Sequence, residues 1–348
     1  MENKLNKIFT QFVAEGEIKD SKTLVSGYIN ETFLIETTGD NHPDYVLQKL
    51  NHQVFPNIPE LMNNKVHVTE FLREKTKGAQ VVLKFFKTLD GLYYYQDAEG
   101  YYWNLMEFIP DSKVLETTQN QNQAHEAGRS FGNFIKLLDD FPANEVYEII
   151  KDFHKMSFRY KQFDEALENA SAERKEKAAP WIQQVLDSRE KMQELERLNE
   201  TGDIPTRVTH NDTKLSNILF DNNDKALCII DLDTLMPGIV HYDFGDSIRT
   251  ICSTVSEDEP NLDLVQFNLD YYKAYKKGFL KELGDILNEK EIELLPLSAQ
   301  TITFIMGLRI LTDYLNGDVY YNINYPEHNL HRASNQLTLV KRMAEALK

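Results

Sequence analysis

The sequence predicts an α+β protein with two lobes, in which a small antiparallel β-sheet lobe over residues 1–109 precedes a large, mainly helical lobe over residues 110–348. Three observations predict this class. Short segments rich in β-branched and aromatic residues, separated by turn residues, fill the first third of the chain. Segments with apolar residues at helical spacing fill most of the remainder. One short β-like island, residues 218–233, interrupts the helical part.

The first lobe is predicted to be an antiparallel meander with one helix laid on it. Its candidate strands end at turn residues such as Asp90 and Gly91, which favour tight hairpins. A helix is expected at about residues 59–75, where Pro59 suits the first turn. The strand-forming segments are residues 23–37, 44–51, 80–88, 92–96 and 101–109.

The second lobe is predicted from helical periodicity. In residues 121–140, apolar side chains recur at the helical spacing. The charged stretch 171–199 has fewer apolar positions, so we expect it at the periphery. Further helices are predicted at about residues 264–283, 289–315 and 326–348. Pro296 is expected to break or kink the second of these helices.

Composition and charge exclude several classes of function. The formal net charge of −17 argues against a broad nucleic-acid surface, which needs clustered Lys and Arg, and against an anionic membrane partner. Cys228 and Cys252 allow no disulfide framework and no paired-cysteine metal site. The N-terminal residues lack the apolar core of a signal peptide, and no apolar run of about 18 residues is present. We therefore expect a cytoplasmic monomer that acts on small molecules.

The segment THNDTKLSNILF carries the strongest chemical signal. Asp212 lies two residues after His210 and five before Asn217, and Asp231 follows 19 residues after Asp212 on the next apolar strand. Phosphoryl transfer needs a carboxylate that accepts the proton of the attacking hydroxyl, and it needs hard oxygen ligands for Mg²⁺. The spacing predicts Asp212 as the base, and Asn217 and Asp231 as the Mg²⁺ ligands.

Each of these residues has a simpler interpretation when it is taken alone. Asp212 fits an Asx turn or a helix cap, Asn217 a turn residue and Asp231 an ordinary strand-end carboxylate. The three intervals together favour the catalytic interpretation. A short crossover near residues 107–110 agrees with it, because a cleft-type kinase binds nucleotide between its two lobes.

Three residues in or near this segment are expected to have supporting roles. Asp243 begins the sequence Asp-Phe-Gly, which binds metal in protein kinases, but it lies 31 residues after Asp212, too far for that role. We expect Asp243 to be a cap or a supporting group. His210 is expected to orient the loop by hydrogen bonding. Lys214 either offsets charge on the transferred phosphate or is a solvated surface lysine, and the first role is favoured.

Two residues nearer the C-terminus are candidates for an acceptor site. Arg309 lies in a mostly apolar helical segment, so its guanidinium needs a partner. That partner is either a set of substrate oxygens or Asp313, one helical turn on, and the residues alone leave both open. Tyr320 offers an apolar ring face and a hydroxyl, although the chain has 17 tyrosines.

Several motifs resemble the aminoglycoside-phosphotransferase-like kinases, a superfamily that includes choline and homoserine kinases. The resemblance spans nearly the whole chain and is strongest to the kinases of N-acetylhexosamines. It implies a protein-kinase-like fold, the use of ATP with Mg²⁺, and phosphorylation of the anomeric hydroxyl of N-acetylglucosamine or N-acetylgalactosamine. The motifs are GYINETFL at 27–34, RVTHNDTKLSNIL at 207–219, IIDLDTLMPG at 229–238, FGDSIR at 244–249 and YPEHNL at 325–330.

The resemblance assigns roles on the acceptor side of the site. Asp212 corresponds to the base that faces the sugar hydroxyl, and Asn217 and Asp231 correspond to the Mg²⁺ ligands. Tyr28 replaces a histidine that the family places near the sugar, which leaves the hexosamine preference open. The residues implied around the sugar and the transferred phosphate are Asp212, Lys214, Arg309, Tyr320 and Tyr28.

On the nucleotide side the resemblance is weaker. Gly27 lies in a turn where backbone could approach a phosphate, and the backbone groups of Glu107 and Ile109 would meet adenine at the crossover. Gln48 aligns with the strand lysine that usually contacts ATP phosphates, whereas Lys49 points to the opposite sheet face. No glutamate partner is assignable on the following helix, because Lys65, Val66 and His67 occupy the expected region.

Two other functions compete with this hypothesis. A kinase of the same fold could act on another small acceptor, such as an aminoglycoside, choline or a different sugar; choline would need an aromatic cage. A degenerate kinase could serve as a ligand sensor or interaction module, but Asp212, Asn217 and Asp231 argue against that. A protein kinase is disfavoured because no recognisable activation segment follows the metal carboxylate.

Overall fold

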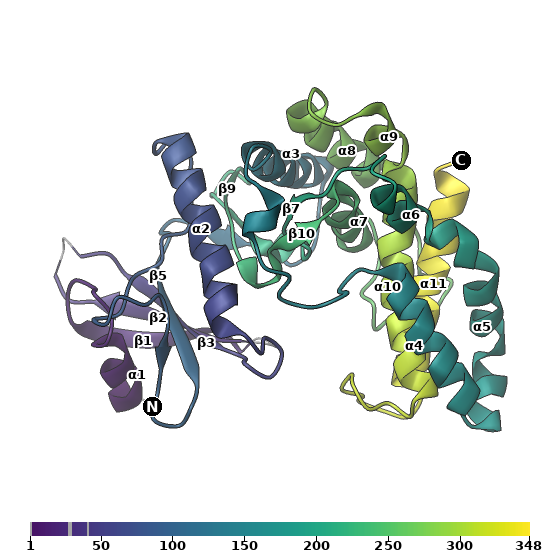
Figure 1. The fold of residues 1–348 in the computed structure, drawn as a ribbon, viewed down its shortest axis with the longest axis horizontal. Helices are drawn as coiled ribbons and strands as arrows, with labels where there is room; N and C mark the ends of the chain where they lie inside the picture. The colour runs from purple at the N-terminus through teal and green to yellow at the C-terminus, as the bar shows by residue number, and fades with distance from the viewer. Residues whose placement is uncertain (1, 27–29, 40–41) are drawn as a thin grey trace.

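The computed structural model describes residues 2–26, 30–39 and 42–348, and it has the two-lobed α+β fold that the sequence predicts. Figure 1 shows a β-sheet at one end of the molecule and the helices gathered at the other. The sheet is antiparallel, with strand order β1-β2-β3-β5-β4. Its strands are β1 (Ile18–Ser26), β2 (Glu31–Thr37), β3 (Tyr45–Leu50), β4 (Tyr95–Gln96) and β5 (Tyr102–Glu107).

Two helices complete the sheet lobe. Helix α1 (Glu2–Phe9) packs Phe9 and its other apolar residues against β2 and β5. Helix α2 (Ile58–Thr76) begins where the side chain of Asn57 accepts a hydrogen bond from the N–H of Glu60, and Pro59 lies in its first turn as expected. It ends at Lys77, whose φ of 48° is left-handed. Helix α2 thereby lies between the sheet and the helical lobe (Figure 1).

The expected strand at residues 80–88 is wrong. This segment forms only isolated bridges, between Phe85 and Met106 and between Thr88 and Phe12. Its backbone changes partner along its length, because the carbonyl of Lys84 bonds to β5 while that of Lys87 bonds to Val13 beyond α1. A continuous ladder with one neighbour therefore does not form. The strand expected at 92–96 is likewise shortened to Tyr95–Gln96.

The helical lobe contains more helices than the periodicity predicted. The expected helix at 171–199 is divided after Met192, and the one at 289–315 is divided at Leu294, so that Pro296 lies in the first turn of the second part. The helices are α3 (Gln121–Leu137), α4 (Met156–Asn169), α5 (Ala172–Met192), α6 (Glu194–Glu200), α7 (Val240–Ile251), α8 (Leu269–Leu283), α9 (Glu289–Glu293), α10 (Leu295–Leu315) and α11 (His328–Ala346).

Two small sheets embedded in this lobe hold the segment that follows residue 209. Strand β7 (Arg207–Thr209) leads into it and pairs with β10 (Met236–Gly238). Strands β8 (Ile218–Phe220) and β9 (Ala226–Ile229) lead out of it as a hairpin, and β6 (Lys113–Val114) pairs with β8. The predicted island at 218–233 is therefore a real hairpin, and residues 210–217 are fixed at both ends.

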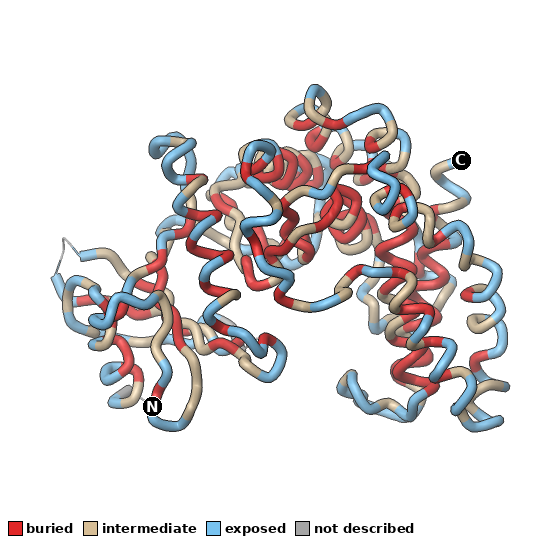
Figure 2. Tube along the Cα trace, in the orientation of Figure 1, coloured by how far each residue is buried: buried red, intermediate tan, exposed pale blue. Residues whose placement is uncertain are grey.

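Helix α10 is the central helix of the lobe. It is long and apolar enough to cross a membrane by composition, with a mean hydropathy of 1.2, but 78% of that window is buried inside the fold. It packs against α4, α5, α7 and α11, which explains its composition without a membrane. Figure 2 shows buried residues concentrated along α7, α10 and α11, whereas α5 is mostly exposed or half-buried. Leu295–Leu315 is the one such helix in the described ranges.

Helices α3 and α8 cross with their backbones in close contact. A Cβ at Gly278 would lie 2.1 Å from the carbonyl oxygen of His125, and a Cβ at Gly128 would lie 2.2 Å from that of Tyr275. Real Cβ atoms do not approach backbone so closely. Both positions therefore require glycine for close approach, although each lies in the middle of a helix, where glycine is otherwise unfavourable.

We expect Gly278→Ala to lower the free energy of unfolding by about 1–3 kcal/mol, because the helices must separate to admit one methyl group. Gly307→Ala in α10 is the matched control, since its Cβ would meet side-chain atoms rather than backbone, with Leu337 Cγ at 3.0 Å and Gln336 Cβ at 3.3 Å. Urea denaturation of both variants measures the difference. Equal stability of the two variants would contradict the backbone contact.

Candidate active site

The loop after β7 is anchored by a buried carboxylate of helix α7. Asp243 is fully buried, and its two carboxylate oxygens accept hydrogen bonds from the backbone N–H groups of His210, at 2.9 Å, and Asn211, at 2.7 Å. Its carbonyl oxygen accepts a bond from the hydroxyl of Thr213 at 2.5 Å. Burial raises the pKa of Asp243 to about 6, which the two backbone donors oppose. Asp243 thus supports the loop, as the spacing predicted.

His210 connects the loop to the strand that precedes Asp231. Its Nδ1 lies 3.3 Å from the N–H of Asp212, and its Nε2 lies 2.9 Å from the carbonyl oxygen of Ile230. With Nδ1 as acceptor, Nε2–H is the donor to Ile230. The ring is buried between Phe131 and Phe134. These contacts match the orienting role expected for this histidine.

Asp212 presents a partly exposed carboxylate beside one lysine and one amide. Its Oδ2 accepts a hydrogen bond from Nδ2 of Asn217 at 2.9 Å and lies 3.0 Å from Nζ of Lys214. Burial alone would raise the pKa of Asp212, but the charge and hydrogen bond of Lys214 and the hydrogen bond from Asn217 outweigh it and lower the pKa. The side chain is 30% exposed. The carboxylate is therefore ionised, reachable from solvent and adjacent to the ammonium group of Lys214.

Asp231 follows β9 in a left-handed backbone conformation, with φ of 59°. Strain of this kind is common at functional sites. The N–H of Ile230 donates to the carbonyl oxygen of Asn217 at 3.0 Å, which brings Asp231 next to Asn217. Burial, together with the charges of Asp233 and Asp212, raises the pKa of Asp231 to about 7. The structure thus brings the predicted base and both predicted ligands together.

These residues fit Mg²⁺. The amide nitrogen of Asn217 is used by Asp212, so the amide oxygen is the atom left for a cation. The carboxylate of Asp231 lies among other carboxylates whose repulsion a cation would relieve. Within the described ranges, no three His, Cys, Asp or Glu residues form a metal site by themselves. Mg²⁺ usually takes one or two carboxylates from a protein and completes its shell with phosphate and water oxygens.

On the nucleotide side, the two candidates of β3 lie on opposite faces of the sheet. Oε1 of Gln48 accepts bonds from Asn104 at 3.2 Å and from Lys65 at 3.4 Å, in the interior. Lys49 pairs with Glu31 at 2.7 Å and lies over the ring of Tyr101. Only Gln48 therefore belongs to the side that carries α2.

The crossover between the lobes contains one backbone N–H group, that of Ile109, without a hydrogen-bond partner among the described residues. The N–H of Glu107 bonds to Lys84, and the N–H of Phe108 bonds to Asp44, whereas that of Ile109 has no partner among the described residues. A cavity of about 550 Å³ lies beside this segment. Glu107 and Ile109 line it, whereas none of residues 210–217 does. Gly27 and Tyr28 lie outside the described residues.

Arg309 does not pair with Asp313. Asp313 instead accepts hydrogen bonds from the backbone N–H groups of residues 319–321 and from the side chain of Asn329. Within the described part of the chain, no ion pair joins Arg309 to a carboxylate; its guanidinium lies 5.6 Å from the centroid of the Phe153 ring, and its Nη1 lies 3.8 Å from Sδ of Met306. Tyr320 is 70% exposed, in the loop that Asp313 holds.

Arg159 is a second cation here that the sequence did not indicate. Its guanidinium donates to the carbonyl oxygen of Phe153 at 2.6 Å and to Gln162 at 2.9 Å. Burial, and then the charge of Arg309, lower its pKa to about 10. Next to it, burial lowers the pKa of His154 to about 3, and Nε2 of this neutral ring lies 3.3 Å from the carbonyl oxygen of Asn211. The two arginines thus lie on the side of the loop that carries residue 211.

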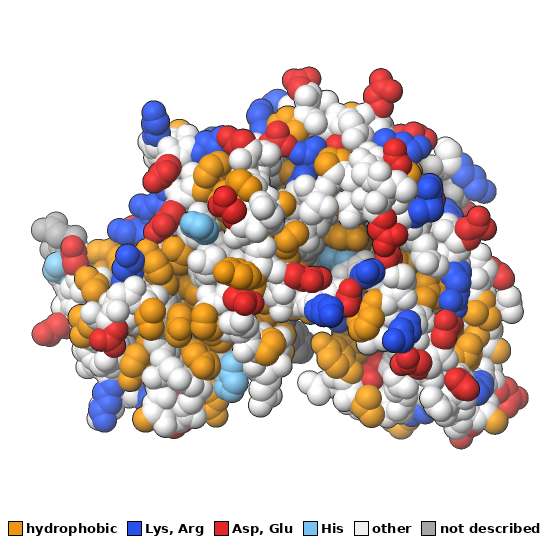
Figure 3. All heavy atoms as spheres, viewed as in Figure 1, with side chains coloured by type: hydrophobic (Ala, Val, Ile, Leu, Met, Phe, Trp, Pro, Cys, Tyr) orange, Lys and Arg blue, Asp and Glu red, His pale blue; other side chains and the backbone are white. Residues whose placement is uncertain are grey.

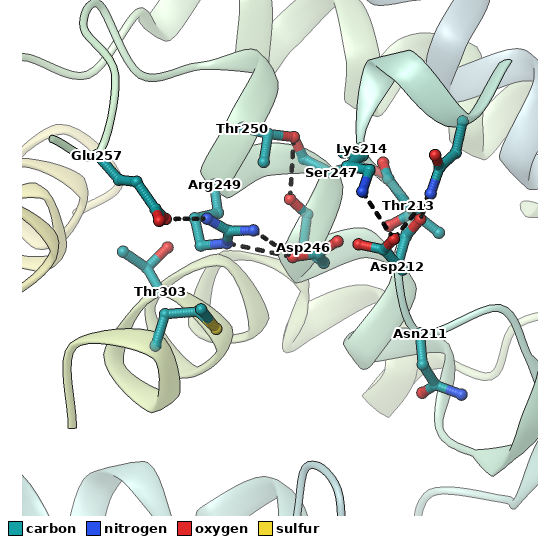
Figure 4. A network of polar contacts seen from close by, with 12 residues as sticks. Asn211, Asp212, Thr213, Lys214, Asp246, Ser247, Arg249, Thr250, Glu257 and Thr303 are labelled. Atoms are coloured by element: carbon teal, nitrogen blue, oxygen red, sulfur yellow. Dashed lines mark hydrogen bonds and ion pairs between the residues drawn. The ribbon is translucent and has the colours of Figure 1, made fainter. Parts of the chain in front are cut away.

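A buried ion network supports the loop from the other side (Figure 4). Oδ1 of Asp246 accepts two bonds from Arg249, at 3.0 and 3.1 Å, and Arg249 in turn lies 3.4 Å from Glu257. Ser247 donates to the carbonyl oxygen of Thr213 at 2.8 Å. Sequence reasoning assigned no role to Asp246 or Arg249. Their spacing of three residues within a helix was the available signal.

An antiparallel sheet lobe joined to a helical lobe, with two carboxylates and an amide gathered on one loop and the following hairpin, is the arrangement expected of a kinase-like phosphotransferase. Residues 20–277 match the family described as the phosphotransferase enzyme family, APH, and the chain belongs to that family.

Solved structures of low sequence identity share the fold. A microcompartment-associated aminopropanol kinase is 15% identical with a TM-score of 0.68, covering 100% of this chain and 98% of that one. A spectinomycin phosphotransferase in complex with ADP and spectinomycin is 12% identical with a TM-score of 0.57, covering 99% and 98%. An ethanolamine kinase of Plasmodium vivax is 15% identical with a TM-score of 0.54, covering 91% and 82%.

We expect Asp243→Ala to destabilise the protein by roughly 2–4 kcal/mol, because two buried N–H groups lose their acceptor. The loop that carries Asp212 would be released, so phosphotransfer should fall as well. Asp243→Asn keeps one oxygen acceptor, so its stability and its phosphotransfer rate should lie between those of Asp243→Ala and the wild type. Denaturation together with ADP-release assays measures both effects, and a stable, fully active alanine variant would contradict the anchoring role.

Proposed function

We propose that this protein is an N-acetylhexosamine 1-kinase, which transfers the γ-phosphoryl group of ATP to the anomeric hydroxyl of N-acetylglucosamine or N-acetylgalactosamine. The observation that carries the kinase part of this proposal is the convergence of Asp212, Asn217 and Asp231 on one side of an anchored loop. The sugar part rests on the motif resemblance over the whole chain. We further propose that the protein acts as a cytoplasmic monomer.

In this proposal each residue has one chemical task. Asp212, ionised and partly exposed, accepts the proton of the anomeric hydroxyl as that oxygen attacks. Lys214 lies beside Asp212 and offsets negative charge on the transferred phosphoryl group. Asn217 and Asp231 would hold Mg²⁺, which shields the phosphate oxygens when it is bound. The carbonyl of Glu107 and the N–H of Ile109 would meet adenine, with Gly27 and Gln48 toward the phosphates.

The charges around Arg309 favour a neutral acceptor over an amine. Arg309 and Arg159 lie together without a carboxylate partner in the residues described, so a cationic acceptor would be repelled there. Sugar hydroxyl and carbonyl oxygens, in contrast, accept hydrogen bonds from guanidinium groups. Tyr320 and Tyr28 are proposed to complete this side of the pocket.

The second candidate is a kinase of a small amino alcohol or aminoglycoside. It is favoured by the structures of the aminopropanol and ethanolamine kinases, whose folds match over 91% or more of this chain. The exposed surface also mixes acidic and basic side chains on both lobes, with a hollow between the lobes (Figure 3), so access is not restricted to one sign of charge. The acceptor therefore has to be settled by experiment.

An acceptor screen with coupled detection of ADP distinguishes the two candidates. We expect turnover with N-acetylglucosamine or N-acetylgalactosamine, with the phosphate on carbon 1 by NMR, and little turnover with ethanolamine, choline, aminopropanol or aminoglycosides. Turnover of an amine alone would replace the first candidate with the second. No turnover with any acceptor would favour a ligand sensor over an enzyme.

We expect Asp212→Asn to lower kcat by about 10²–10⁴-fold, because an amide cannot accept the proton of the attacking hydroxyl. Binding of Mg·ADP should persist, since the crossover and Asp231 are unchanged. Initial rates at saturating ATP and acceptor, with calorimetric titration of Mg·ADP, measure the two properties separately. Wild-type kcat in this variant would remove Asp212 from the role of base.

A further inference from the structure

Helix α2 carries a buried lysine, Lys65, that has no role in the phosphoryl transfer proposed for Asp212 and Lys214. Lys65 is only 2% exposed, and its Nζ lies 2.5 Å from Oδ1 of Asp233. The pair joins the two lobes, because Asp233 follows β9 of the helical lobe, two residues after the proposed metal ligand Asp231. A buried ion pair of this kind contributes little net stability when compared with apolar residues. Stability alone therefore does not explain the Lys65–Asp233 pair, and a function in the site does.

The ammonium group of Lys65 lies at a particular place on the sheet. It is 3.4 Å from Oε1 of Gln48, the residue that stands at the position of the usual phosphate-binding strand lysine. Asn104 of β5 fixes that amide by donating to the same oxygen at 3.2 Å. A cation is therefore present at the end of the Gln48 side chain, but it arrives from the helix rather than from the strand.

Within the described ranges, hydrogen bonds account for two of the three N–H donors of Lys65, and its Nζ lies 5.4 Å from the centroid of the Phe85 ring. An ammonium group has three donors, and two of them face Asp233 and Gln48 in the described ranges. Asp233 is itself held in place, because its Oδ2 accepts a bond from Nδ2 of Asn30 at 2.5 Å, and Oδ1 of Asn30 accepts the N–H of Asn51 at 2.9 Å. Asn30, which precedes β2, and Lys65 of α2 thus converge on one carboxylate.

We propose that Lys65 is the phosphate-binding cation of the nucleotide lobe, which donates to an oxygen of the α- or β-phosphate of a Mg²⁺-bound nucleoside di- or triphosphate. Its ion pair with Asp233 holds the ammonium beside Asp231, so that phosphate and metal ligand keep a fixed separation. This proposal also explains why α2 has no glutamate to pair with a strand lysine. The positive charge that such kinases carry on the strand, at the position of Gln48, is carried here by Lys65 on the helix. This inference rests on the proposed kinase function, of which it is the nucleotide half.

Calorimetric titration of Lys65→Gln with Mg·ADP and, separately, with adenosine tests the proposal. We expect the Kd for Mg·ADP to rise about tenfold, because one charge-assisted hydrogen bond to phosphate is lost. The Kd for adenosine should change by less than about twofold, since adenosine has no phosphate. If Lys65 only held the lobes together, the substitution would weaken the binding of Mg·ADP and of adenosine to the same extent, and that result would overturn the proposal. Unchanged binding of Mg·ADP would also overturn it.

Lys75→Gln is the matched control. Lys75 lies on the same helix and also forms an ion pair across the lobes, with Asp140, but it is 32% exposed and at the far end of α2. We expect its Kd for Mg·ADP to equal that of the wild type. Equal weakening in both variants would show that interlobe pairing in general, and not the cation at Lys65, supports nucleotide binding.

The exchange variant Gln48→Lys with Lys65→Gln keeps the test decisive if the single variant does not fold. It returns the lysine to the strand while Asp233 keeps a cationic partner, and we expect it to bind Mg·ADP within about threefold of the wild type. Weak binding by a folded exchange variant would count against the proposal. These titrations need no acceptor, so a protein that phosphorylates no N-acetylhexosamine would lose the proposed substrate while the assignment of Lys65 stands or falls independently.

Discussion

Repulsion among three carboxylates is the constraint on which the site depends. Asp212, Asp231 and Asp233 gather where the lobes meet, and like charges in a poorly hydrated place disfavour one another's ionised forms. Lys214 neutralises the first and Lys65 the third. Asp231 has no cationic side chain in ion-pair contact within the described residues. The site is therefore built to accept one more positive charge, at the carboxylate assigned to Mg²⁺.

The supporting structure keeps this strained arrangement in place. The carboxylate of Asp243 fixes the start of the loop through two backbone bonds, and the Asp246–Arg249 pair lies behind it in the same helix. The two small sheets fix the ends of the loop, so the positions of Asp212 and Asn217 follow from backbone pairing more than from their own contacts. Helix α7, which the periodicity did not reveal, is thus the element that organises the site.

Local spacing was enough to predict that Asp212, Asn217 and Asp231 lie close together, because all three lie on one short hairpin and the loop before it. The strand at 80–88 was wrong, because β propensity cannot show that the backbone of Lys84 and Lys87 bonds to two different neighbours. Contacts between residues that are distant in the sequence could not be predicted either. The Arg309–Asp313 alternative failed because Asp313 serves the backbone of residues 319–321, and the pairing of Lys65 with Asp233 spans 168 positions.

The crossing of α3 and α8 has a consequence for how this sequence can diverge. With Gly128 and Gly278 facing the opposite backbone, neither position can gain a side chain unless the helices move apart. Helix α3 also contacts β9, which leads to Asp231, so such a movement would reach the strand that positions this carboxylate. Relatives that keep this tight crossing should carry glycine at both places, and relatives that lack it should show a wider interhelical distance and a shifted hairpin.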